Sequence, residues 1–125
     1  MISFDQYSIE DGSPIYVQIL RYIKRGIVSG TVMDGDELPS RRVLSSLLGI
    51  NPNTVQKAYR MLEEEGLIES RSGAKSIMVL DGETIERIRS ELMAGDVLSV
   101  ISALKQAGMS KEEAIELIKL NWGGE

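Results

Sequence analysis

The stretch from residue 38 to residue 59, LPSRRVLSSLLGINPNTVQKAY, constrains the fold more than any other part of the chain. Its pattern predicts two short helices joined by a tight turn. Ser40 is a good N-cap for the first helix, because its hydroxyl can accept a hydrogen bond from a backbone N–H two or three residues later. Gly49 supplies the left-handed residue that commonly ends a helix. Asn51 caps the second helix, and Pro52 takes its first position, where a missing N–H costs nothing.

The apolar residues of this stretch recur at helical spacing. In the first helix they are Val43, Leu44, Leu47 and Leu48. In the second helix they are Val55, Ala58, Tyr59 and Leu62. The opposite face of the second helix is polar and cationic, with Asn53, Lys57 and Arg60 flanked by Thr54 and Gln56. The pattern therefore predicts a helix-turn-helix with a cationic reading face.

Charge is distributed unevenly along the chain. The net charge of −5 would by itself argue against binding to nucleic acid. Residues 38–62, however, contain no acidic residue and four basic ones, Arg41, Arg42, Lys57 and Arg60. A local basic surface on an acidic body can orient a protein on a polyanion. The alternative, an ordinary solvated surface, is weaker because these cations coincide with the best-capped pair of helices.

The composition argues against an enzyme. The chain has 125 residues, about one domain with a small appendage, and contains neither Cys nor His. The usual zinc, copper and haem ligands are therefore missing, as are imidazole and thiolate catalysts. The acidic group Asp34, Asp36 and Glu37 is typical of a solvated turn rather than a cation site. We expect no metal, no cofactor and no enzymatic activity.

No apolar run approaches the ~18 residues that a membrane span requires, and no signal-peptide pattern follows Met1. The absence of Cys fits a reducing compartment. We therefore expect a cytoplasmic protein without a membrane segment.

A helix is expected to begin at Ser13-Pro14 and to end at Gly30, with an apolar stripe of Tyr16, Ile19, Leu20, Ile23 and Ile27. Its simplest role is to support the helix pair, although its cations Arg21, Lys24 and Arg25 leave a phosphate contact open. Residues 33–37 are predicted to form a turn-rich connection.

A β-hairpin is predicted directly after the helix pair. Residues 67–71 alternate in polarity, Ser72-Gly73 forms a turn, and residues 76–80 form a second apolar strand. A hairpin in this place is a wing, and its tip is expected to reach an adjacent DNA groove through Arg71, Ser72, Gly73 and Lys75. The alternative is that the tip is polar only because hairpin tips generally are.

The remaining residues, 81–125, are predicted to form helices that end near Gly95 and Gly108, followed by a third helix with a capping box at Ser110 and Glu113. So few helices cannot enclose a core of their own. They must pack on the winged helix or on another chain, and we favour another chain. The residues expected at the resulting dimer interface are Ile85, Ile88, Leu92, Val97, Ile101, Leu104 and Ile118.

Residues 38–73 combine P-S-R-R, an L-G turn, N-x-N-T-V-x-K-A-Y and E-G-L-I-E-x-R-x-G in this order. In these segments, and more weakly in SPIYVQI at 13–19, the chain resembles the GntR family of bacterial transcriptional regulators. Its short helical tail is similar to that of the YtrA-like subfamily, which has a small dimerisation region in place of a large effector-binding domain. The resemblance implies a winged-helix fold, a homodimer and a palindromic DNA operator, and names no effector.

The family's DNA-contacting positions fall on Arg42, Asn51, Asn53, Thr54, Gln56 and Gly73. Pro52 replaces an Arg that is frequent in the family, so the bases read should differ. Phosphate contacts are expected from Arg41, Arg42, Lys57, Arg60 and Lys75. Base contacts are expected from Asn53, Thr54 and Gln56, whose amides suit the donor and acceptor of adenine.

The sequence thus predicts a mostly α-helical fold with a small β-hairpin. Residues 1–80 form a winged helix-turn-helix DNA-binding domain, and residues 81–125 form a helical dimerisation region. The predicted function is regulation of transcription, with repression favoured over activation. The alternative is a winged-helix module that binds other proteins and no DNA.

Overall fold

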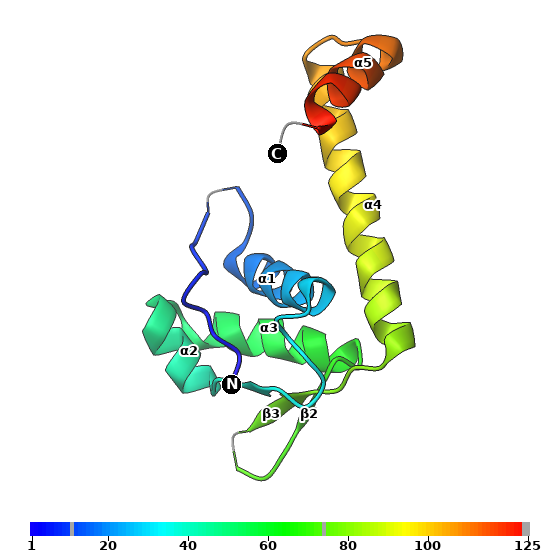
Figure 1. The fold of residues 1–125 in the computed structure, drawn as a ribbon. Coiled ribbons are helices and arrows are strands. Elements are labelled where there is room, and N and C mark those ends of the chain that lie inside the picture. The colour runs from blue at the N-terminus through cyan, green and yellow to red at the C-terminus, as the bar shows by residue number, and fades with distance from the viewer. Residues whose placement is uncertain (11, 74, 124–125) are drawn as a thin grey trace. The chain divides into compact units, whose positions relative to one another are not determined.

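The structure, a computed structural model, describes residues 1–10, 12–73 and 75–123 (Figure 1). In chain order the elements are α1 (Ile15–Ser29), β1 (Glu37–Leu38), α2 (Arg41–Leu48), α3 (Pro52–Glu64), β2 (Ile68–Ser70), β3 (Ser76–Met78), α4 (Gly82–Gln106) and α5 (Lys111–Trp122). The chain divides into two compact units, Met1–Arg89 and Ser90–Glu125. The fold is mostly helical with one small sheet, as predicted.

The predicted start and end of α2 and the predicted start of α3 are confirmed. The Ser40 hydroxyl accepts a hydrogen bond from the Val43 N–H at 3.1 Å, and the Asn51 side-chain oxygen accepts one from the Asn53 N–H at 2.8 Å. Gly49 ends α2 in the left-handed region, with φ of 66°. Because each terminus satisfies groups that a helix leaves unpaired, these short helices begin and end where the sequence specifies.

The core of the first unit forms where α1 and α2 pack against α3 (Figure 1). The predicted apolar face of α3 is fully buried, at Val55, Ala58, Tyr59 and Leu62. Burial of each large apolar side chain contributes about 1.5–3 kcal/mol.

The prediction for α2 was only partly correct. Leu44 is fully buried, whereas Val43 and Leu47 are 53% and 60% exposed. This eight-residue helix presents only a narrow strip to α3, so the rest of its apolar stripe stays on the surface.

The sheet has three antiparallel strands in the order β1-β3-β2, and not the two of a simple hairpin. The missed strand, β1, pairs Glu37 with Ile77 and Leu38 with Ser76. Residues 33–37 were expected to form only a connection, and a two-residue strand is too short to show any alternation. The turn itself exists, because the Asp36 carboxylate accepts a hydrogen bond from the Met33 N–H at 2.8 Å.

Helix α1 begins one residue later than predicted. Pro14 occupies the N-cap and makes no side-chain cap hydrogen bond. Gln18 organises the preceding segment instead, donating from its amide to the carbonyls of Glu10 at 2.6 Å and Ser13 at 2.8 Å. The N-terminal arm is also anchored, since the Ile2 N–H donates to the Glu37 carbonyl at 2.8 Å.

The C-terminal segment departs from prediction in its helix count. Residues 82–106 form one continuous helix that runs through Gly95, where a helix end was expected. A single Gly costs about 1 kcal/mol relative to Ala in a helix, which does not interrupt a helix that continues on both sides. The capping box at Ser110 and Glu113 is confirmed. No helix among the described residues is long and apolar enough to cross a membrane.

Candidate nucleic-acid interface

Tyr59 joins α3, the second helix of the pair, to the start of α2. Its side chain is fully buried, and its hydroxyl donates a hydrogen bond to the Pro39 carbonyl at 2.7 Å. Burial raises the pKa of the Tyr59 hydroxyl, so the group remains a protonated donor. Because Pro39 immediately precedes Ser40, this bond ties the N-cap of α2 to α3.

Arg41 lies on this support. Its guanidinium is 5.1 Å from the centroid of the Tyr59 ring, within the range of a cation–π interaction. Its Nε–H donates a hydrogen bond to the side-chain oxygen of Gln56. Two residues that were predicted separately, one for phosphate and one for a base, are therefore in contact.

Lys57 is also supported by an aromatic ring. Its ammonium group is 4.0 Å from the ring centroid of Tyr16, a half-buried residue of α1. Tyr16 was predicted only as part of the α1 apolar stripe. Its contact with Lys57 has no signal in the sequence, because the two residues belong to helices that meet only in the folded chain.

The other predicted cations lie on the surface. Arg60 is 3.9 Å from Glu64, and Arg71 is 2.7 Å from Glu69, in exposed ion pairs of the kind worth at most about 1 kcal/mol. Such weak pairs can be exchanged for phosphate contacts at little cost.

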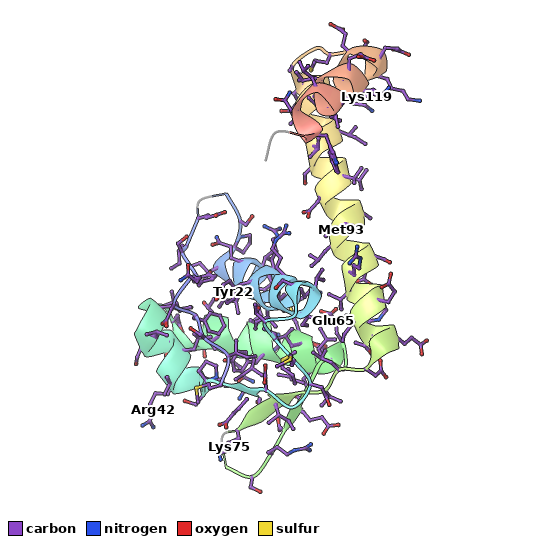
Figure 2. The ribbon with its side chains drawn as sticks, in the orientation of Figure 1. Tyr22, Arg42, Glu65, Lys75, Met93 and Lys119 are labelled. Atoms are coloured by element: carbon purple, nitrogen blue, oxygen red, sulfur yellow. The ribbon has the colours of Figure 1, made fainter. Side chains whose placement is uncertain are left out.

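Arg42 and Lys75 are exposed, and neither forms an ion pair with a carboxylate among the described residues. In Figure 2 they project from α2 and from the hairpin. Lys24, by contrast, is engaged in a bridge to Glu65 at 2.9 Å, which favours a structural role for this cation of α1.

The remaining predicted contacts are polar groups at the same two elements. Asn53 is exposed and Thr54 half-buried in the first turn of α3, while Ser72 and Gly73 are exposed in the hairpin turn. Gly73 has φ of 74°, a conformation that few other residues adopt. Asn51 is exposed, but its side-chain oxygen is already used as the cap of α3.

The acidic turn has a structural role. Asp34 accepts a hydrogen bond from the Leu80 N–H at 2.8 Å, and so ties the connection after α1 to the end of the hairpin. Within the part of the chain that the structure describes, no three side chains of the metal-binding types are grouped to hold an ion.

The structure combines a capped helix pair, an exposed cationic face on the second helix and an adjacent hairpin, or wing, within a three-stranded sheet. These features define a winged helix-turn-helix protein. The model of the gntR family of bacterial regulatory proteins matches residues 15–76. The chain is 36% identical over 126 residues to the HTH-type transcriptional repressor YtrA of Bacillus subtilis, a match that covers 95% of this chain and 90% of that protein.

Two solved structures extend this comparison. A GntR family transcriptional regulator from Listeria monocytogenes superimposes with a TM-score of 0.75 at 36% identity, covering 89% of this chain and 97% of that one. The AraR DNA-binding domain in complex with operator ORX1 matches with a TM-score of 0.50 at 25% identity, over 58% of this chain and 88% of that one. The chain therefore belongs to the GntR family, and it is a DNA-binding transcriptional regulator rather than an enzyme.

Proposed function

We propose that this protein is a cytoplasmic repressor that binds a palindromic operator as a homodimer. The observation that carries the DNA part is the surface formed by α2, the exposed face of α3 and the wing. Its cations either lack a carboxylate partner among the described residues, as Arg42 and Lys75 do, or are held in weak exposed pairs. Repression is supported by the name of the Bacillus subtilis relative.

In this proposal the cations of the surface position the protein on phosphates, and Asn53, Thr54 and Gln56 contact base edges. The N-terminal turn of α3 would enter the major groove, as the second helix of a helix-turn-helix does. Selection of duplexes from a random pool by the purified protein tests this assignment. We expect a two-fold symmetric sequence to be enriched, and enrichment of no sequence would contradict the proposal.

The dimer is supported by apolar surface in the unit formed by residues 90–125. Val97, Ile101 and Ile118 are 56%, 41% and 42% exposed, and the half-buried Leu104 joins them in lining a groove between α4 and α5. No residue of α5 is buried. Because burying a Leu or Ile is worth about 1.5–3 kcal/mol, a second copy that covers this groove would gain considerable stability.

The interface proposed here is smaller than the sequence predicted. Ile88 is fully buried and belongs to the first unit. It therefore offers no surface to a second chain. Ile85 and Leu92 are half-buried. We therefore assign the dimer contact to the groove, with Val97, Ile101, Leu104 and Ile118 at its centre.

Trp122 lines the same groove, is 83% exposed and is the only Trp in the chain, so it reports on dimer formation. We expect its emission to shift to shorter wavelength as protein concentration rises. Ile101→Asp should abolish this shift and yield a monomer in sedimentation. Leu98→Asp is the matched control, because Leu98 is 66% exposed and lies outside the groove. A wild-type monomer that still binds a palindrome tightly would refute the dimer.

A further inference from the structure

The contact between Arg41 and Gln56 bears on which base α3 selects. We infer that the two residues act as one reading unit, in which Gln56 offers a base only its amide N–H₂ group and so selects guanine over adenine. The inference rests on the proposed function, since it concerns the bases that the α3 face contacts. It replaces the expectation from sequence that Gln56 pairs with adenine.

The first step is the orientation of the Gln56 amide. A guanidinium has N–H donors and no acceptor, so the atom of Gln56 that meets the Arg41 Nε–H must be the amide oxygen. The amide nitrogen is left to face other groups. The Arg41 contact also polarises the amide, which strengthens its N–H groups as donors.

The second step is the effect on base choice. Adenine presents an N7 acceptor beside an N6 donor, and a glutamine reads both only when its oxygen is free to accept. Here the oxygen already accepts from Arg41, and the adjacent positive charge repels a further N–H donor. Guanine presents two acceptors, N7 and O6, and therefore suits an amide N–H₂ beside a cation.

The third step is what holds Arg41 in place. Its guanidinium lies over the ring of Tyr59, whose hydroxyl is bonded to the Pro39 carbonyl and whose side chain is fully buried. The reading unit is thus supported by the core before DNA arrives. A side chain that is already ordered loses less conformational freedom when it binds.

The test is duplex selection with five forms of the 125-residue chain, the wild type and four variants. Gln56→Ala identifies the base pair that Gln56 reads, as the position whose preference disappears. The wild type should enrich guanine there. Arg41→Met keeps a long side chain over Tyr59 but removes the donors, so the freed amide should regain adenine. The ratio of guanine to adenine should fall by about 3- to 10-fold, the effect of one hydrogen bond.

Arg60→Met is the matched control, because Arg60 is an exposed arginine of the same helix pair whose guanidinium pairs with Glu64 at 3.9 Å. It should weaken binding and leave this base preference unchanged. If Arg41→Met fails to fold, Gln56→Glu provides the second variant: its carboxylate still pairs with Arg41 but has no N–H₂, so guanine should be lost.

Retention of guanine by Arg41→Met or by Gln56→Glu would overturn the inference and leave the proposed function standing. Enrichment of adenine by the wild type at this position would do the same. Enrichment of no sequence by the wild type would instead overturn the proposed function, and the inference with it.

Discussion

Replacement of Tyr59 by Phe tests how strongly the link between α3 and the start of α2 stabilises the first unit. The change removes one oxygen, and with it the 2.7 Å hydrogen bond to the Pro39 carbonyl. Pro39 is buried, so its carbonyl loses its side-chain donor in a place that water reaches poorly. A buried polar group that loses its partner costs about 1–3 kcal/mol. We expect the free energy of unfolding to fall by that amount.

Urea denaturation followed by far-UV circular dichroism measures this loss, at one protein concentration because association would add its own stability. Tyr22→Phe is the matched control. The Tyr22 hydroxyl donates to the Ser3 carbonyl at 2.8 Å in an exposed position, where water can replace it, so its loss should cost less than about 0.5 kcal/mol. Equal stability of the two variants would refute the reasoning.

The same variant has a predicted pH dependence. Because burial raises the pKa of the Tyr59 hydroxyl above its ordinary value of 10.0, the folded state holds this proton more tightly than the unfolded state does. The stability linked to that proton is complete below pH 10 and is lost as the pH rises further. Tyr59→Phe lacks this contribution, so its disadvantage should shrink in alkaline solution. A constant difference across this range would contradict the assignment.

Three further predictions concern the interface and the C-terminal unit. Arg42→Ala should weaken operator binding by about 1–3 kcal/mol with an unchanged unfolding curve, and unchanged affinity would remove Arg42 from the interface. Lys57→Ala should weaken binding to all sequences about equally and reduce the salt slope by ~1, whereas an altered base preference would contradict a phosphate contact. Hydrogen bonding of the Glu113 carboxylate, first with the Ser110 backbone N–H and second with the Ser110 side chain, lowers the pKa of Glu113 below its ordinary 4.5. The capping box should therefore stabilise α5 above that pH and weaken as the pH falls further, a change in helicity that Glu113→Gln should lack and that equal acid sensitivity would disprove.

Much of this protein follows from local sequence. Caps act over two or three residues, so Ser40, Asn51 and Ser110 could each be assigned from their neighbours alone, and the structure confirms all three. The buried face of α3 follows from helical periodicity, and the cationic surface follows from the absence of acids in residues 38–62. None of these features depends on which distant segment packs against the helix.

Tertiary structure decided what depends on packing between distant segments. Strand β1 exists because β3 pairs with it, and Val43 is exposed because α3 covers only a narrow strip of α2. Packing also explains Gly26, because a Cβ at this position would lie only 2.5 Å from the Val32 Cγ2 atom. The contacts of Arg41 with Gln56 and of Lys57 with Tyr16 join separate helices. Sequence shows that these residues are cationic, amide or aromatic, but only the crossing of the helices brings their side chains within reach.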